Sequence, residues 1–368
     1  MLNRRNLRIK AMQTLFAFQQ LRTSNRQISW ERLEEASKDL PGTAPDQVAN
    51  LEQLFKQQLI EPGNLPKEFT EEQKAGIEAE LSTYNRQISK DLKFLRSQML
   101  LEVEDVHKLF LWVLALFLAL ADFEGMLLAK SLLQGRQKVY LKDMRSIEVL
   151  QKSLADTQLP SWDANQDRVS QWYKEIKNHQ GLTEEFGKET SGLDAEVKKL
   201  RYIFKSILWK SESFQNFFEE YDRGWIENKD IIKSLVNKTF KSITDEGVVL
   251  APLSYQWEDD KQFFADIFDT TIKHESWSEK LIGDSSKNWK TDRIAQVDMI
   301  LLKMALSEMI NFPSIPVKVT INEYIEMSKK YSTPKSKKFI NGLLDVLAND
   351  LMASGTIKKS GRGLIDNK

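Results

Sequence analysis

Apolar residues recur every three or four positions along most of this chain, a spacing that predicts helices rather than strands. Near the start, Leu7, Ala11, Leu15 and Phe18 share one helical face and predict a helix over residues 4–21. Strand-like alternation is rare, and glycine (15) and proline (9) are scarce among 368 residues. Four more helices are predicted in the last third, over residues 258–275, 291–310, 320–331 and 334–351. We therefore expect an all-α protein.

The middle of the chain alternates between polar and strongly apolar segments. Residues 29–88 are polar and are interrupted by PGTAPD and EPGNLP, so they predict two or three surface helices. Residues 89–135 are dense in Leu, Phe and Met and predict one long helix or a helix pair. Their most apolar run, residues 109–121, is shorter than the roughly 20 residues that a membrane span needs. It therefore predicts a buried core helix, with no membrane contact.

Two of the predicted helices begin with cations, although acids are favoured at the positive end of the helix dipole. The cations at these two starts are Arg4, Arg5, Arg8 and Lys10 in the first helix, and Lys335, Lys337 and Lys338 in the last. Helix N-termini bind phosphate readily, so one interpretation is a pair of anion-binding ends. The other is that these are solvated surface side chains, which cost little. The residues alone leave both open.

Charge is distributed unevenly along a chain whose net charge is zero. Residues 1–22 carry five basic side chains and no acid, and residues 311–368 carry ten basic and five acidic ones. The 288 residues between them hold 38 basic and 48 acidic side chains. Basic ends and an acidic middle favour a local anion-binding surface over general polycation behaviour.

The residue inventory excludes several kinds of chemistry. There is no cysteine, which removes disulfides, thiol nucleophiles and cysteine-held metals, and there are only three histidines. No phosphate-binding glycine loop or serine-hydrolase motif is present. We therefore expect a protein that is not an enzyme and has no metal site and no cofactor. The charged first residues lack a following apolar run or cleavage site, which predicts a cytoplasmic protein.

The two cation-led helices also carry a family resemblance. RRNLRIKAMQTLF (4–16) resembles the arginine-rich opening motif of NusB, the bacterial transcription antitermination family. ILLKMALSEMINFPSIPVKVTINEYIEMSKKYSTPKSKKFINGLLDVLA (300–348) resembles that family's L-R-x-A-x-x-E-L, P-x-K-V-x-I-N-E and K-F-[VI]-N-G-[VL]-L-D blocks, in order. These blocks cover the two ends of the chain and leave a large segment between them.

The resemblance implies a NusB-like fold of packed helical bundles with a large helical insertion. Residues 1–22 and 258–351 would form the core that binds RNA and partner, residues 23–257 the insertion, and residues 352–368 a disordered tail. It implies binding to boxA-type single-stranded RNA of ribosomal RNA transcripts. It also implies a protein partner, the small-subunit ribosomal protein NusE, and assembly into the RNA polymerase antitermination complex.

Carried over position by position, the resemblance also implies site residues. The RNA-binding positions are Arg4, Arg5, Arg8, Lys10, Lys335, Ser336, Lys337, Lys338 and Phe339. The partner-binding positions are Phe16, Asp292 and Asp298. Three of these depart from the family pattern: Phe16 stands where Tyr is usual, Asp298 where Glu is frequent, and Lys335 where some members have an acid.

Two other function classes and one local feature bear on this interpretation. NusB-like domains also precede some ribosomal RNA cytosine methyltransferases, but those enzymes need a cysteine and a glycine-rich cofactor loop. Alternatively, the protein is a non-catalytic interaction scaffold in ribosome biogenesis, acting through its acidic helical insertion.

Gly342, inside the last predicted helix, costs about 1 kcal/mol relative to alanine, and we attribute it to close helix packing rather than to ligand contact.

Overall fold

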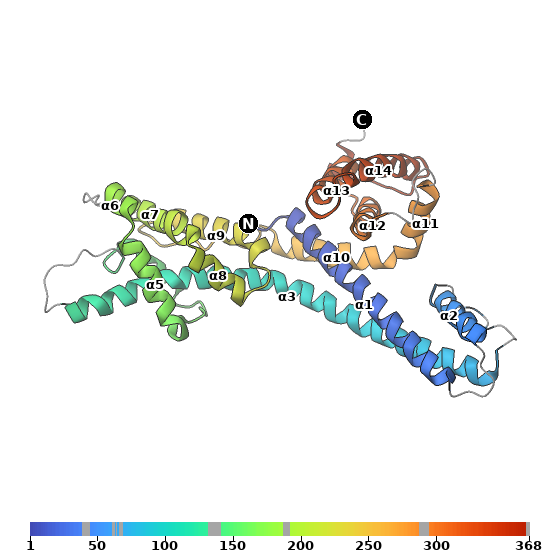
Figure 1. Ribbon diagram of the computed structural model, residues 1–368. Coiled ribbons are helices and arrows are strands. Elements are labelled where there is room, and N and C mark those ends of the chain that lie inside the picture. Colours follow the sequence, from blue (N-terminus) through green and yellow to red (C-terminus); the bar gives the residue numbers. More distant parts are fainter. Residues whose placement is uncertain are drawn as a thin grey trace. The chain divides into compact units, whose positions relative to one another are not determined.

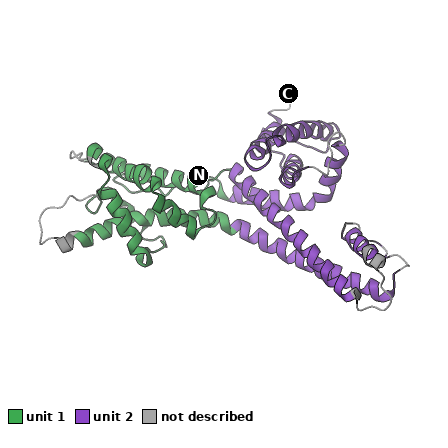
Figure 2. Cartoon of the chain, viewed as in Figure 1, with its two compact units in different colours: residues 1–3, 101–257 green, residues 4–100, 258–368 purple. Residues whose placement is uncertain are grey.

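The computed structural model describes residues 1–38, 45–60, 63, 65, 69–131, 141–186, 192–286 and 294–365. Within these ranges the chain is helical and contains no strand, only an isolated bridge between Thr244 and Gly247. This confirms the predicted all-α class. The chain divides into two compact units, one of residues 1–3 and 101–257 (unit 1) and one of residues 4–100 and 258–368 (unit 2; Figures 1 and 2).

Unit 2 contains both cation-led helices and surrounds a central apolar helix. Its helices are α1 (Arg4–Lys38), α2 (Pro45–Ile60), residues 71–100 of α3 (Glu71–Ser131), nearly all of α10 (Trp257–Lys273), α11 (Glu275–Ser285), α12 (Gln296–Asn311), α13 (Val317–Tyr331), α14 (Ser336–Ala353) and a short 3-10 turn (Gly361–Leu364). Helices α1, α11, α13 and α14 pack against α12 (Figure 1). The side chains of α12 are buried around its circumference, as expected for a helix that is apolar on all faces.

The predicted helices of the last third are confirmed, with shifted starts. Helix α12 begins at Gln296 instead of residue 291, and Thr291 lies outside the described residues. Helix α13 begins directly after Pro316, earlier than the predicted start at Thr320. The Thr320 hydroxyl is buried and donates to Glu308 at 2.8 Å, so a core contact takes this side chain away from the helix end.

The first helix is much longer than predicted, because it continues from residue 21 to Lys38. Its second half, α2 and the start of α3 replace the separate surface helices expected over residues 29–88. They enclose a small core of their own: Trp30, Leu33, Leu51, Leu54, Phe55 and Ile77. Residues 23–100 thus group with the C-terminal helices, whereas the sequence predicted that they belong to the insertion.

The disordered tail predicted for residues 352–368 is wrong for the residues that the structure describes there. Helix α14 continues to Ala353, and residues 354–365 fold back onto the loop after α12. Ile357 is buried, the Ser360 amide donates to the Pro313 carbonyl at 3.0 Å, and the Lys359 ammonium donates to the Phe312 carbonyl at 3.0 Å. Residues 366–368 lie outside the described part.

Unit 1 is built on the second half of α3, residues 101–131. Its other elements are α4 (Arg145–Leu154), a 3-10 turn (Asp163–Asn165), α5 (Gln166–Lys177), α6 (Gln180–Phe186), α7 (Leu193–Tyr202), a π-helical turn (Ile203–Ile207), a 3-10 turn (Leu208–Lys210), α8 (Glu212–Tyr221) and α9 (Trp225–Lys241). The apolar stretch of α3 is long enough by length and composition to span a membrane, but 67% of it is buried against the rest of the protein. This agrees with the predicted core helix.

Candidate nucleic-acid interface

Arg8, predicted to contact RNA, lies in the core of unit 2. Its guanidinium donates two hydrogen bonds of 2.7 Å to Glu308, and the two side chains are 4% and 0% exposed. Thr320 and Tyr324 also donate to this carboxylate. Burial lowers the pKa of Arg8, but the charge and hydrogen bonds of Glu308 outweigh burial and raise it. Arg8 therefore has a packing role in this structure, and its RNA contact stays a prediction.

The other cations at the start of α1 differ in exposure. Arg4 donates to Asp260 at 3.2 Å, and Arg5 donates to both carboxylate oxygens of Glu323 at 2.7 and 2.8 Å. The side chains of Arg4 and Arg5 remain 40% and 48% exposed. Lys10 is buried, and its RNA contact stays a prediction. Acids from α10, α12 and α13 thus offset the cations that oppose the dipole of α1.

The five RNA-binding residues predicted at the start of α14 differ in exposure. Lys335, Lys337 and Lys338 are exposed. In the described part of the chain none of the three forms an ion pair; the acids of neighbouring α13 pair with Arg5, Arg8 and Lys329. Ser336 and Phe339 are buried and make packing contacts, and their RNA contacts stay predictions.

The two helix starts approach one another at Glu326 of α13. A hydrogen bond from Lys329 is the main cause that lowers the pKa of this carboxyl, and the positive charges of Arg5 and Lys337 lower it further. The charges of cations from α1 and α14 therefore both act on this carboxylate, although they stand far apart in the sequence. Helices α13 and α14 lie side by side (Figure 1). We name the exposed cations here the basic edge: Arg4, Arg5, Lys335, Lys337 and Lys338.

Gly342 lies one turn beyond the basic edge on α14 and faces solvent. A Cβ atom added at this position would have no heavy atom within 4 Å outside the local helix backbone. The attribution of Gly342 to close helix packing is therefore wrong. An open glycine beside exposed lysines is instead compatible with the close approach of a ligand backbone.

The predicted partner-binding residues lie in different environments. Phe16 is 36% exposed on α1, which is unusual for a large aromatic ring. Asp298 is buried at the start of α12, where its Oδ2 accepts a hydrogen bond of 2.6 Å from Ser336. In this structure Asp298 forms an internal contact between α12 and α14, and its contact with a partner stays a prediction. Asp292 lies outside the described residues.

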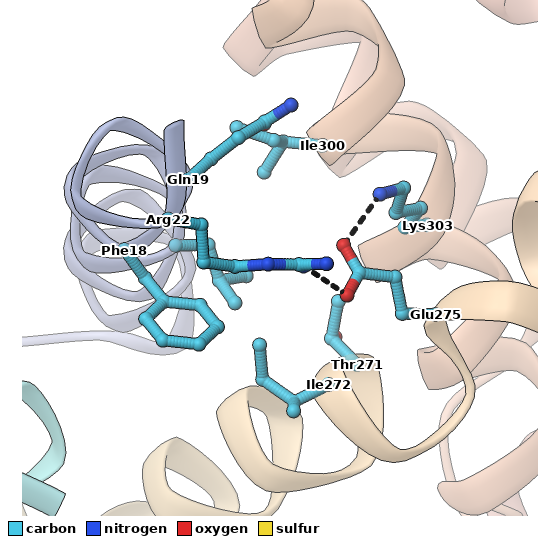
Figure 3. A pocket seen from close by; sticks show the side chains of 9 residues that line it. Phe18, Gln19, Arg22, Thr271, Ile272, Glu275, Ile300 and Lys303 are labelled. Atoms are coloured by element: carbon cyan, nitrogen blue, oxygen red, sulfur yellow. Dashed lines mark hydrogen bonds and ion pairs between the residues drawn. The ribbon is translucent and has the colours of Figure 1, made fainter. Parts of the chain in front are cut away.

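A narrow hollow of about 20 Å³ lies between α1, α10, α11 and α12 and contains an ion-pair network (Figure 3). Glu275 accepts from Arg22 at 2.5 Å and from Lys303 at 2.8 Å. Burial raises the pKa of Glu275, but the charges of Lys303 and Arg22 outweigh it, so the net shift is downward. The hollow has room for about one water molecule, and the network ties the helices together. The sequence feature that could have predicted this network is Lys303, a lysine within the apolar run of α12.

Comparison with known proteins identifies the family of the C-terminal region, which contains the three lysines of the basic edge. The model of the NusB family matches residues 246–349, which include α10 to α13 and most of α14. These residues form a NusB-family domain. The N-terminal motif lies outside that match, and in the structure α1 packs on α12 of the domain.

Three relatives of the NusB-family domain are named transcription antitermination protein NusB. The protein of Chloroherpeton thalassium is 37% identical over 137 residues, which is 37% of this chain and 62% of the relative. That of Salinibacter ruber is 40% identical over 105 residues (28% and 66%), and that of Natranaerobius thermophilus is 47% identical over 73 residues (20% and 52%). The chain thus spans between about half and two thirds of the length of these relatives. No solved structure matches it.

Proposed function

We propose that this protein is a transcription antitermination factor that binds boxA-type single-stranded RNA of ribosomal RNA transcripts at the basic edge. The observation that carries the proposal is that both cation-led helix starts adjoin α13 in the same unit: Arg5 of α1 donates to Glu323 of α13, and α14 with its exposed lysines packs on α13. Single-stranded RNA offers phosphates to such cations. The names of the relatives of the NusB-family domain support the same function.

The structure changes the number of phosphate contacts that the sequence alone would suggest. Arg8 and Lys10 are buried, while Arg4 and Arg5 are partly exposed and paired with acids. The three exposed lysines of α14 are the strongest candidates for contact. Three to five contacts predict a slope of log affinity against log salt of about −2 to −3.5, since each contact on a single strand contributes about −0.7.

The proposal includes the ribosomal protein NusE as a partner and the RNA polymerase antitermination complex as the site of action. The exposed ring of Phe16 offers an aromatic anchor of the kind that dominates protein interfaces. Asp298 supports the partner only indirectly, by holding Ser336 at the start of α14. Asp292 remains a predicted contact.

The test is binding of fluorescently labelled boxA-type RNA and a scrambled RNA to the full chain, with and without NusE, over a range of salt concentrations. The variant Lys337→Ala/Lys338→Ala is compared with Lys273→Ala/Lys280→Ala, which removes two exposed lysines elsewhere in unit 2. We expect a preference for boxA-type RNA that strengthens with NusE and is lost in the first variant only. Equal affinity for the two RNAs with and without NusE, or equal losses in both variants, would overturn the proposal.

A further inference from the structure

Unit 1 has a concentrated group of cations, although it belongs to the acidic part of the sequence. Along α7 and the π-helical turn that follows, Lys198, Arg201 and Lys205 are spaced three and four residues apart and share a face. Helix α9 packs against α7 and adds Lys233 and Lys241. We name these five side chains the α7–α9 cluster.

Like charges in the α7–α9 cluster act on one another at Lys205, and Glu185 is the one acid among the described residues that line a hollow beside it. Burial lowers the pKa of Lys205, and the charges of Arg201, Lys241 and Lys233 lower it further. Two ion pairs of unit 1, Lys108 with Asp105 and Arg145 with Asp245, involve none of these five side chains. Repulsion of this kind destabilises a fold, so the arrangement suits a surface that meets an anion.

A hollow of about 280 Å³ opens beside the cluster. Its lining residues are Glu185, Phe186, Lys198, Arg201, Tyr202, Lys205 and Ser206. The Nε atom of Arg201 is buried and has no hydrogen-bond partner. Because an unpaired buried donor is costly, this atom is an independent indication that an acceptor belongs here.

The backbone beside the hollow is also unusual. Residues 203–207 form a π-helical turn, which continues α7 and carries Lys205. Such turns are rare and are frequently found at functional sites. The turn changes the helical register at the place where the cations gather, so the unusual backbone and the charge cluster occur together.

We infer that the α7–α9 cluster is a second phosphate-binding surface and that its ligand is the backbone of single-stranded RNA. The rings of Phe186 and Tyr202, 5.4 Å apart between centroids, line the same hollow and are partly exposed. Aromatic rings among cations are the combination that binds stacked bases and phosphates of a single strand. The choice of RNA as the anion rests on the proposed function, whereas the cluster and the hollow do not.

The test uses the full chain and a labelled oligouridylate of about 30 nucleotides, which has no boxA sequence and is long enough for several phosphate contacts. The variant Lys198→Gln/Lys205→Gln/Lys241→Gln is compared with Lys152→Gln/Lys174→Gln/Lys177→Gln, which removes three exposed lysines of unit 1 outside the cluster. We expect the first variant to bind at least tenfold more weakly and to reduce the salt slope by about 2, at about 0.7 per lost contact. The second should bind like the natural chain. Equal affinities of the two variants would overturn the inference.

Two further measurements locate the effect and separate this inference from the proposed function. Oligouridylate should protect Lys205 and Lys241 from chemical acetylation, read by mass spectrometry, and unchanged labelling of both would contradict the inference.

The second measurement separates this inference from the proposed function. The Lys198/Lys205/Lys241 variant should keep its preference for boxA-type over scrambled RNA, which the Lys337/Lys338 variant loses. If neither RNA is preferred but the cluster variant still weakens oligouridylate binding, the proposed function fails and this surface stands. If the cluster variant loses binding to vesicles containing phosphatidylserine and keeps RNA binding, the ligand is a lipid and the inference is wrong.

Discussion

Arg8 of α1 and Glu308 of α12 form a buried ion pair with two parallel hydrogen bonds of 2.7 Å. The same carboxylate accepts from Thr320 and Tyr324 of α13, so one acid joins three helices of unit 2. An arginine for which the family resemblance implies RNA binding is thus a core contact in this structure. It fixes α1 on α12 and thereby determines where the exposed Arg4 and Arg5 lie.

Replacing Arg8 by methionine should destabilise unit 2 strongly. The substitution leaves Glu308 buried without its cation, and removing one partner of a buried ion pair costs about 3–5 kcal/mol. Arg5→Met removes a half-exposed partner of Glu323 and should cost less than about 1 kcal/mol. Urea denaturation at neutral pH measures both. If Arg8→Met kept the stability of the natural chain while RNA affinity fell tenfold, Arg8 would contact RNA after all.

The ion pair between Arg5 and Glu323 should compete with RNA. Glu323→Gln removes the negative charge that Arg5 faces and frees its guanidinium for a phosphate. We expect RNA affinity to rise severalfold and the salt slope to become steeper by about 0.7, the effect of one additional phosphate contact. Asp284→Asn, at an exposed position on α11 of the same unit, gives the matched change of net charge. Equal gains in both variants would show a general charge effect instead of a local one.

Asp298 should influence the start of α14 through Ser336. Asp298→Ala removes the charged acceptor of the buried Ser336 hydroxyl, which keeps only the hydroxyls of Thr333 and Ser332 at 2.8 and 3.0 Å, and should cost about 1 kcal/mol. Asp298→Asn keeps an acceptor oxygen of the same shape and should retain most of the stability. With the fold preserved, Asp298→Asn should bind NusE as the natural chain does. A loss of NusE affinity in this variant, without a loss of stability, would indicate direct contact with the partner.

The sequence predicted the helical class and most helices of the last third, because apolar periodicity reports directly which face of a helix is buried. It failed where burial depends on distant partners. Arg8 and Ser336 look like surface residues of a polar helix start, and only Glu308 and Asp298, brought from α12, show that they are internal. Local patterns cannot show such long-range pairs.

Segment boundaries failed for a related reason. Residues 23–38 carry few apolar positions, yet they extend α1 because Trp30 and Leu33 pack on α2 and α3. The polar residues 354–365 look disordered by composition, but the Pro313 and Phe312 carbonyls hold them in place. In both segments, a few tertiary contacts outweigh the local composition.

The docked residues 354–365 should respond to alkaline pH through Lys359. Partial burial lowers the pKa of this lysine to about 8, from 10.5. The unfolded chain therefore binds more protons between these values, and stability should rise as the pH increases from about 8 towards 10.5. Below about pH 8 the full penalty for the buried charge is present. Denaturation of the natural chain and of Lys359→Met at several pH values should show this rise in the former only. The exposed neighbour, in the variant Lys358→Met, is the control; a pH dependence that persists in Lys359→Met would assign it to another group.

Gly342 provides a test of the basic edge in which stability and binding should change in opposite directions. A methyl group at this exposed helical position meets no neighbour, so Gly342→Ala should stabilise α14 by about 0.5–1 kcal/mol. If an RNA backbone approaches the helix here, the same methyl group should weaken boxA binding severalfold. The control is Asn349→Ala, an exposed position near the other end of α14. Urea denaturation and RNA titration of the same protein samples measure the two effects. A variant that is more stable and binds RNA as tightly as the natural chain would place the RNA away from this turn of α14.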